Sequence, residues 1–413
     1  MDKEDGAGDM TDSHGATGAT VSGQPKNYFA SYEDLSVHEL MLKDFPRTQA
    51  YKKFFEENAA HFKDKVVLDV GAGTGVLSLF AASVGAKKVY AVEASKMSEL
   101  CKEIVKCNGF EDKVEVFSCP VEELALPENT KVDVLVSEWM GFYLLHEAML
   151  DSVIYARDKF LASNGIMAPS KATLYVAPTD IDSYHSSHVE YWNNVYGFDF
   201  SSVIPLVTQK FQKEPVITEV QSTELLASAQ KVVELDLKTV ILTDVQKISQ
   251  KLDIKMDKSG ILRGFASWFD VEFSPLDSSL ACGVLSTSPD SPQTHWKQTV
   301  FMLPEEIPID TGDEISTLVE LSQDEGNKRH YNISIELLDM EDDYSDENDH
   351  PVPCDCGATR CLLIKKVMDT YDEEHRELEA EADSVNVEAE TEAVRVMNTE
   401  MSLESSDLEI IDQ

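Results

Sequence analysis

Short apolar runs that alternate with glycine turns between Lys65 and Trp139 constrain the fold of this chain more than any other feature. The run KVVLDV is followed by the turn GAGTG, the helical stretch VLSLFAASVGA and a second apolar run, KVYAVEAS. Two further runs, KVEVFSC and VDVLVSEW, come next, and a helix is expected from about Leu144 to Leu161. Strands that alternate with helices in this way predict an α/β fold with a parallel sheet and crossover helices.

The pattern changes further along the chain, where Asn164-Gly165 and Pro169 predict a joint. Beyond it come short runs of alternating hydrophobicity: ATLYVAP, VVELDL, GFASWFDVEF, HWKQTVFML and YNISIELL. A period of two predicts antiparallel strands, arranged as a barrel or a sandwich. An aromatic-rich segment from Tyr184 to Phe200 interrupts them and predicts a helical insertion.

Composition limits the range of functions. The chain has 413 residues, of which 42% are hydrophobic, so its length suggests about two domains. Its formal net charge of −41 repels polyanions, so we expect no direct nucleic-acid binding and favour basic partners. No apolar run reaches the roughly 18 residues of a membrane span, and the N-terminus lacks an apolar signal core, so a location inside the cell is expected.

The two ends of the chain differ from its middle. Residues 1–26 are small and polar, and residues 341–413 carry 23 Asp and Glu against 5 Lys and Arg. Both ends are therefore predicted to be largely disordered. The seven cysteines are irregularly spaced and do not indicate a disulfide framework.

The turn GAGTG is a candidate cofactor loop. Gly71, Gly73 and Gly75 lie directly after a strand and at the start of a helix, where the backbone can approach a ligand and N–H donors are available. Glu93 ends the next strand, where its carboxylate can bind both hydroxyls of a ribose. The spacing G-x-G-x-G, rather than the G-x-G-x-x-G of dinucleotide folds, favours S-adenosylmethionine over a dinucleotide. An ordinary glycine turn is the alternative.

Four further motifs make the chain resemble the protein arginine N-methyltransferases: YFASY, HELMLKDFPRT, SEWMGFYLLHEAM and THWKQTVF. This resemblance implies a Rossmann-like class I S-adenosylmethionine methyltransferase domain, followed by an antiparallel β-barrel with a helical dimerisation arm. The implied boundaries are 1–26 for a disordered tail, 27–168 for the cofactor domain with its N-terminal helices, 169–340 for the barrel, about 182–204 for the arm and 341–413 for the acidic tail.

The resemblance also implies a function. The chain would transfer methyl groups from S-adenosyl-L-methionine to the guanidino nitrogens of arginine in histone tails or Gly/Arg-rich proteins. It would be a homodimer in the nucleus and the cytoplasm. Two rival classes are a non-catalytic scaffold that retains the fold and an S-adenosylmethionine enzyme for small molecules. The complete set of site residues argues against the first, and the barrel and arm argue against the second.

Carried over position by position, the resemblance assigns three groups of residues. Those that would bind the cofactor are Tyr28, His38, Arg47, Asp69, Gly71, Gly73, Glu93 and Glu122. Those that would contact the substrate are Tyr32, Met41, Met149 and Trp296, and the catalytic set would be Glu138, Glu147, His295 and Asp44. Within these groups, Arg47 would pair with the cofactor carboxylate, Glu122 would accept from the adenine amine, and the two tyrosines would close over the site.

The two glutamates of SEWMGFYLLHE, Glu138 and Glu147, suit a cationic substrate. A guanidinium stays protonated at pH 7 and the methyl donor is a sulfonium, so two carboxylates would offset their repulsion and orient the planar fork. The released proton would pass to the pair of His295 and Asp44 or to Glu147, and the sequence leaves both routes open. The methionines beside the substrate and the motif THW match the type that forms asymmetric dimethylarginine.

The acidic tail departs from the family pattern. Cys354, Cys356 and Cys361 form C-x-C-x4-C, which looks like the zinc-binding tail of SET-type lysine methyltransferases. Tetrahedral zinc needs a fourth ligand, for which His350 or a distant cysteine would have to serve, so no metal is assigned and reduced surface cysteines are the alternative. The final residues, SSDLEIIDQ, would add a strand to a partner's sheet or form a plain polar tail.

Overall fold

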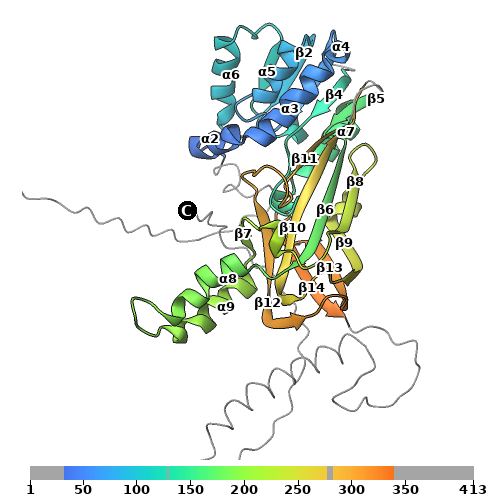
Figure 1. Ribbon diagram of the computed structural model, residues 1–413. Helices are drawn as coiled ribbons and strands as arrows, with labels where there is room; N and C mark the ends of the chain where they lie inside the picture. The colour runs from blue at the N-terminus through green and yellow to red at the C-terminus, as the bar shows by residue number, and fades with distance from the viewer. Residues whose placement is uncertain (1–31, 128–129, 277–281, 339–413) are drawn as a thin grey trace, which may run out of the picture.

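A parallel sheet with flanking helices and a set of antiparallel strands lie end to end in the molecule (Figure 1). The computed structural model describes residues 32–127, 130–276 and 282–338. Tyr28, both tails and the cysteines of the acidic tail lie outside these residues. Within the described ranges, no helix has the length and apolar character needed to span a membrane.

The parallel sheet has the strand order β3-β2-β1-β4-β5. Its strands are β1 (Val66–Val70), β2 (Lys88–Val92), β3 (Val114–Phe117), β4 (Val132–Val136) and β5 (Leu161–Ala168). The helices of this half are α2 (Leu35–Lys43), α3 (Phe45–Glu57), α4 (Ala59–Phe62), α5 (Val76–Ser83), α6 (Met97–Cys107) and α7 (Met149–Phe160), with the 3-10 turn η1 (Val121–Glu123). Strands β1 and β4 are almost wholly buried, which explains their continuous valine and leucine runs and confirms the predicted parallel sheet.

The Asn164-Gly165 pair, expected at a joint, lies inside strand β5 instead. The pairing of β5 with β4 is irregular around it, since the register advances by five residues on β5 but by two on β4. The turn-forming pair is therefore absorbed as a bulge. The chain leaves the parallel sheet only at Pro169, before the first antiparallel strand.

Helix α7 begins at Met149, not near Leu144 as expected. Glu147 and Ala148 have left-handed backbone angles, with φ of 72° and 49°, which an α-helix cannot contain. Only a short 3-10 turn, η2 (His146–Ala148), precedes the helix. The prediction was wrong because nothing in this part of the sequence reveals that distant segments hold the loop out of the helix.

Two antiparallel sheets form the second half and give the predicted barrel. The larger follows the path β7-β12-β10-β6-β8, with β11 paired to β10, and the smaller follows β14-β13-β9. Their strands are β6 (Lys171–Thr179), β7 (Val216–Thr218), β8 (Gln230–Asp236), β9 (Lys247–Lys255), β10 (Gly260–Phe273), β11 (Gly283–Ser286), β12 (Gln298–Ile309), β13 (Glu314–Gln323) and β14 (Tyr331–Leu338), with η5 (Ser222–Glu224) and α10 (Leu242–Gln246) between them. Strands β7, β9, β11 and β13 were not recognised in the sequence.

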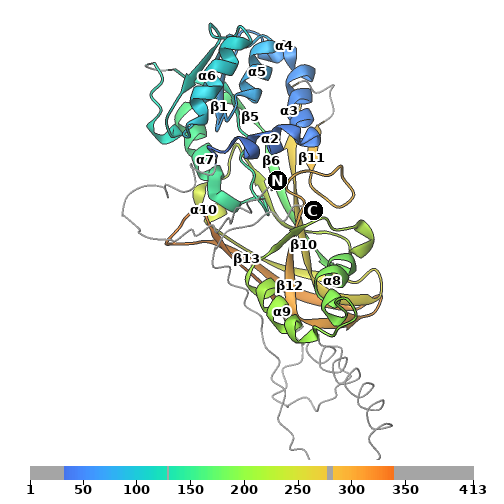
Figure 2. The same cartoon turned by 90° about the vertical axis from the view of Figure 1, so that its left-hand side faces the viewer.

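A helical arm leaves the larger sheet between β6 and β7 and projects from the molecule (Figure 1), and Figure 2 shows it from the side toward which it projects. It contains α8 (Asp182–His188), η3 (Glu190–Asn193), η4 (Ser201–Val203) and α9 (Ile204–Lys213), so it extends beyond the expected residue 204. Apolar side chains lie exposed on it: Tyr196 is 95%, Phe198 70% and Leu206 67% accessible. The aromatic insertion is therefore a helical excursion with an uncovered apolar surface.

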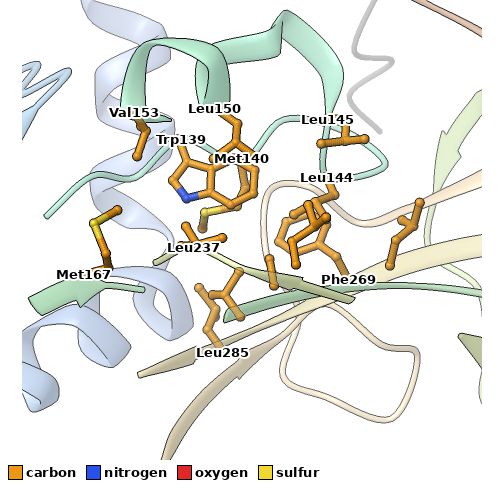
Figure 3. Close-up of a cluster of buried hydrophobic side chains, with 14 of the residues drawn as sticks. Trp139, Met140, Leu144, Leu145, Leu150, Val153, Met167, Leu237, Phe269 and Leu285 are labelled. Carbon is orange, nitrogen blue, oxygen red and sulfur yellow. The ribbon is translucent and has the colours of Figure 1, made fainter. Parts of the chain in front are cut away.

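The loop after β4, residues 137–148, is held between the two halves of the molecule (Figure 3). Its Trp139, Leu144 and Leu145 belong to one buried cluster with Phe269 and Leu285 of the larger antiparallel sheet. This loop, called the glutamate loop below, carries both glutamates of SEWMGFYLLHE. Because the cluster spans both halves, both of them fix the position of these acids.

Candidate active site

A cavity of about 430 Å³ lies where the carboxyl ends of β1, β2 and β4 meet helix α2 and the segment before β12. Most of the predicted site residues line it: Tyr32, His38, Met41, Arg47, Gly71, Gly73, Glu93, Glu122, Glu138, Glu147, Met149, His295 and Trp296. Asp44 and Asp69 lie behind its wall. Ligands of open α/β sheets bind at the carboxyl ends of the strands, so this is the expected position.

The glycine turn allows close packing around the cavity. Gly71 and Gly73 have left-handed φ of 74° and 54°. A Cβ atom on Gly71 would lie 2.2 Å from Cε of Met149, and one on Gly73 would lie 3.2 Å from Cε1 of His38. A side chain at either position would therefore press on Met149 or His38 and strain the backbone.

Two acids lie at the cofactor end of the cavity. Glu93 accepts the backbone N–H groups of Gly73 and Ser95 through its two oxygens, each at 2.8 Å. Glu122 accepts the hydroxyl hydrogen of Ser152 at 2.7 Å. Each carboxylate oxygen has a second lone pair, so both acids are held in place and can still accept from a ligand.

Asp69 differs from expectation, because it supports the glycine turn and does not line the cavity. It is fully buried, and one of its oxygens accepts the hydroxyl hydrogen of Ser78 at 2.7 Å. Burial, together with the charge of Glu93, raises the pKa of Asp69 to about 7 in spite of the Ser78 hydrogen bond. Asp69 is therefore a partly protonated acid behind the turn near neutral pH.

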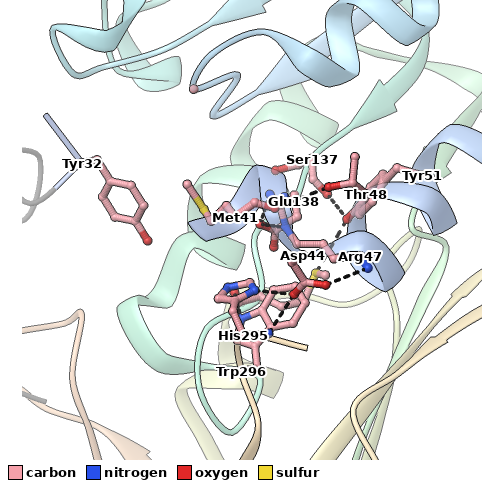
Figure 4. A network of polar contacts seen from close by, with 12 residues as sticks. Tyr32, Met41, Asp44, Arg47, Thr48, Tyr51, Ser137, Glu138, His295 and Trp296 are labelled. Carbon is pink, nitrogen blue, oxygen red and sulfur yellow. Dashed lines mark hydrogen bonds and ion pairs between the residues drawn. The ribbon is translucent and has the colours of Figure 1, made fainter. Parts of the chain in front are cut away.

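Glu138 is tied to Arg47 (Figure 4). Nε and Nη2 of Arg47 donate to Oε2 of Glu138 at 2.9 and 2.6 Å, and Nη1 donates to the carbonyl of Met41 at 2.9 Å. Burial is the largest influence and disfavours the charged guanidinium, but the charge and hydrogen bonds of Glu138, together with Tyr51 and Asp44, outweigh it and raise the pKa of Arg47 above its usual range. The guanidinium of Arg47 thus holds the first acid of the glutamate loop, and its expected pairing with a cofactor carboxylate stays a prediction.

The second carboxylate oxygen of Glu138, Oε1, has no such partner: it is buried and receives no hydrogen bond from the residues that the structure describes. A buried carboxylate oxygen without a donor is unfavourable. This atom of a cavity-lining residue is therefore suited to accept an N–H group from a ligand.

Asp44 joins three segments of the chain. Its Oδ1 caps helix α3 by accepting the N–H of Arg47 at 3.0 Å, and its Oδ2 lies 2.9 Å from the backbone nitrogen of His295 and 2.6 Å from Nδ1. Burial raises the pKa of Asp44, but the hydrogen bonds from His295 and Arg47 together hold it below its ordinary value. An ionised carboxylate only accepts, so Nδ1 carries a hydrogen, and in the neutral form of the ring Nε2 is the acceptor.

Trp296 packs against the ring of His295, with 4.2 Å between their centroids, and its Nε1 donates to the carbonyl of Met140 at 3.1 Å. Both residues precede strand β12, which begins at Gln298, although the sequence pattern placed them in the strand. Because the THW segment lies outside the strand, it can approach the glutamate loop, to which the Trp296 hydrogen bond with Met140 attaches it.

Glu147 lies in a strained part of the glutamate loop. Positive φ angles occur at Tyr143, Leu144, Glu147 and Ala148. Such conformations persist only where the surroundings enforce them, and they concentrate at functional sites. The hydroxyl of Tyr32 donates to Oε2 of Glu147 at 2.6 Å, so the second acid has a partner of its own.

Two cavity residues, His146 and Arg329, were not anticipated. Nδ1 of His146 lies 2.9 Å from the hydroxyl of Tyr143, and burial together with His330 lowers the pKa of His146 to about 4, so the ring is neutral at pH 7. Arg329 comes from the hairpin between β13 and β14, 182 residues from Glu147. No local signal marks either residue, since one lies in an apolar run and the other in an ordinary polar turn.

No group of three or more metal-ligating side chains occurs in the part of the chain that the structure describes. The cysteines within that part are free thiols: Cys101, Cys107, Cys119 and Cys282. The zinc candidates Cys354, Cys356 and Cys361 lie outside it.

Two family models match the chain. The model described as the arginine methyltransferase oligomerization subdomain matches residues 170–342. The model described as ribosomal protein L11 methyltransferase matches residues 48–174. The two matches together span both halves of the fold.

Comparison with individual proteins identifies relatives that match across both halves of the fold. Protein arginine N-methyltransferase 1 of Saccharomyces cerevisiae is 40% identical over 316 residues, which cover 76% of this chain and 88% of the relative. The chain belongs to the protein arginine N-methyltransferases. Protein arginine N-methyltransferase 2 of Homo sapiens is 40% identical over 314 residues, or 76% of this chain and 72% of the relative. The predicted family is confirmed, and with it the transfer of methyl groups to protein arginine.

Solved structures of arginine methyltransferases share the fold. The Trypanosoma brucei PRMT1 enzyme–prozyme heterotetrameric complex with AdoHcy has a TM-score of 0.67 at 35% identity and covers 74% of this chain and 94% of that one. A crystal structure of PRMT6 with SAH has a TM-score of 0.64 at 33% identity and covers 74% and 100%. The likeness extends over almost the whole of each solved chain.

The raised pKa of Asp69 predicts a pH-dependent stability. The native state keeps this proton up to about pH 7, whereas an unfolded aspartate releases it near pH 4. The stability that Asp69 contributes is therefore full below about pH 4 and is lost as the pH rises through about 7. Asp69→Asn has no proton to lose, so its unfolding free energy relative to wild type should increase between pH 5 and pH 8 in urea titrations. A difference that stays constant with pH would contradict the assignment.

Proposed function

We propose that the cavity clamps the guanidinium of a protein arginine between Glu138 and Glu147, with S-adenosyl-L-methionine held against the glycine turn. The observation that carries this proposal is the buried, donor-free Oε1 of Glu138, whose Oε2 is already fixed by Arg47. A carboxylate held in this way needs one more N–H donor, and a guanidinium offers a planar fork of them.

The residues around the glycine turn fit the methyl donor. Gly71 and Gly73 line the cavity without side chains, so a ligand can approach the backbone of the turn, and Glu93 has lone pairs left for the two ribose hydroxyls. Glu122 would accept from the adenine amine, and His38 would lie near the ribose and amino-acid end. Two solved relatives contain the demethylated form of this molecule. When bound, S-adenosyl-L-methionine supplies an electrophilic methyl group on a sulfonium.

The charges of the site suit this chemistry. A guanidinium and a sulfonium repel each other, most strongly in a site of low dielectric. Glu138 and Glu147 offset this repulsion, while Arg47 cancels only part of their charge. Because the acids are held from two sides, they also align one terminal nitrogen of the substrate with the methyl group. Met41, Met149 and the indole of Trp296 would line the rest of the substrate channel.

The proton lost after methylation has two candidate acceptors. Nε2 of His295 is an acceptor, since Nδ1 is bound to Asp44. The carboxylate of Glu147 accepts from Tyr32 and, in the proposed clamp, would also hold the substrate guanidinium, so it is needed in its ionised form. We therefore assign the proton to His295, with Asp44 stabilising the imidazolium that forms.

The product we propose is asymmetric dimethylarginine, formed on histone tails or Gly/Arg-rich proteins. Support comes from the two cavity methionines, from the motif THW, and from the net charge of −41, which attracts basic segments. Localisation in the nucleus and the cytoplasm fits such substrates and remains a prediction.

Incubation of the full chain with a Gly/Arg-rich peptide and S-adenosyl-L-methionine should give mono- and asymmetric dimethylarginine in tandem mass spectrometry. A peptide with lysine in place of arginine should stay unmodified. Symmetric dimethylarginine as the sole dimethylated product would contradict the proposed type.

The charge of Glu138 can be removed without changing its shape. Glu138→Gln should lower kcat by roughly a hundredfold or more, because one preorganised charged contact is lost. Calorimetric affinity for S-adenosylhomocysteine should stay near the wild-type value. The exposed acid Glu103 on α6 provides a matched control, since Glu103→Gln should leave kcat unchanged. Turnover of Glu138→Gln within about tenfold of wild type would mean that the clamp is misassigned.

We also propose a homodimer in which the arm of one subunit covers the outer face of α2 and the start of α3 of the other. Apolar side chains are uncovered at both places, namely Tyr196, Phe198 and Leu206 on the arm and Leu35, Leu40 and Phe45 on the helices. The part of the chain that forms the barrel and arm matches an oligomerization subdomain. Uncovered apolar patches of this kind mark protein interfaces.

Charge placed on the arm should prevent this association. Phe198→Asp should sediment as a monomer at a concentration where the wild type is a dimer, since an apolar contact becomes charged. Val284→Asp, at an exposed apolar position on β11, is the control and should remain dimeric. A Phe198→Asp variant that sediments as a dimer would contradict the proposed interface.

A further inference from the structure

We infer that Arg329 is a positioning residue for Glu147, through which the barrel sets the geometry of the substrate clamp; this inference rests on the clamp proposed above. Each of the two residues donates a hydrogen bond to the backbone carbonyl of the other. The N–H of Glu147 donates to the carbonyl of Arg329 at 2.9 Å, and Nη1 of Arg329 donates to the carbonyl of Glu147 at 2.8 Å. The same arginine lines the active-site cavity.

The glutamate loop needs support from outside. Glu147 and Ala148 have positive φ angles, and such angles persist only where neighbouring structure enforces them. Helix α7 starts directly afterwards and does not extend its own hydrogen bonding back over this turn. The backbone N–H and C=O groups of Glu147 are satisfied from the barrel instead, so the left-handed turn, and with it the direction of the acid, depends on Arg329.

The hairpin that carries Arg329 is itself well fixed. Its turn is closed by hydrogen bonds from the N–H of Asp324 to the carbonyl of His330 and from the N–H of His330 to the carbonyl of Asn327, both at 2.9 Å. Beside the turn, Gln323 donates to Asp151 of helix α7 at 3.0 Å. The hairpin is therefore held by its own hydrogen bonds and contacts α7 just beyond the acid.

Arginine suits this position because its side chain is long and its planar guanidinium holds several N–H donors in a fixed geometry. A guanidinium can donate to the Glu147 carbonyl and keep its positive charge beside the acid that it orients. The contact links the barrel half to the catalytic half at the residue that must meet the substrate. A shift of about 1 Å in such a group is enough to slow an enzyme by roughly a hundredfold.

The test uses the full chain with Arg329→Met, Arg329→Gln and Arg329→Lys. Arg329→Met removes the donor and should lower kcat on a Gly/Arg-rich peptide by roughly tenfold to a hundredfold, with the Kd for S-adenosylhomocysteine unchanged. The Gln and Lys variants keep an N–H donor and should recover part of kcat. If Arg329 served only the stability of the fold, Arg329→Met would lower the melting temperature, but it would not lower kcat while leaving the Kd for S-adenosylhomocysteine unchanged.

Arg157 provides a matched control. It also links helix α7 to the barrel half, since its Nη1 donates to the carbonyls of Leu237 and Val240 at 3.0 and 2.6 Å, but it does not line the cavity. Arg157→Met should lower the melting temperature and leave kcat near wild type. The inference is overturned if Arg329→Met keeps kcat within about twofold, or if Arg157→Met loses as much kcat at equal stability.

Glu147→Gln, assayed in parallel, separates the two claims. If this variant is inactive while Arg329→Met is normal, only the positioning role of Arg329 fails. If Glu147→Gln turns over like wild type, the proposed clamp itself fails.

Discussion

The ion pair between Arg47 and Glu138 is the interaction on which the rest of the active site depends. Glu138 stands at the end of a buried strand, where an unpaired carboxylate would be strongly unfavourable. Arg47 meets it from helix α3, whose N-terminus is capped by Asp44. Asp44 in turn binds His295 through its second oxygen. One connected set of contacts thereby fixes the acid, its cation and the base, although they come from three distant parts of the sequence.

The same pair decides what the cavity can accept. Arg47 occupies one oxygen of Glu138 and leaves the other buried without a donor among the described residues. Glu147 is held differently, by a tyrosine hydroxyl and by the hairpin that carries Arg329. The two acids of the glutamate loop are therefore not equivalent. One is locked by a permanent cation, and the other depends on elements that come from the N-terminal segment and from the barrel.

Much of this architecture was predictable from the sequence. The buried strand VVLDV, the glycine turn and Glu93 carry local signals, because their conformation depends on residues next to them in the chain. The start of α7 was not predictable, because the left-handed turn at Glu147 is imposed by a hairpin far away in sequence. The contacts that Asp69 and Arg47 make within the protein were not predictable for the same reason. Their partners, Ser78 and Glu138, are set by tertiary packing rather than by spacing.

The central claim is that Oε1 of Glu138 accepts the substrate guanidinium. Calorimetric binding of a Gly/Arg-rich peptide and its citrulline counterpart, to wild type and to Glu138→Gln in the presence of S-adenosylhomocysteine, tests this contact directly. Citrulline keeps the shape of arginine and lacks its charge. We predict a coupling free energy between the two changes of about 1.5 kcal/mol or more, as for a hydrogen bond between charged groups. Additive effects of the two changes, with no coupling, would contradict the account.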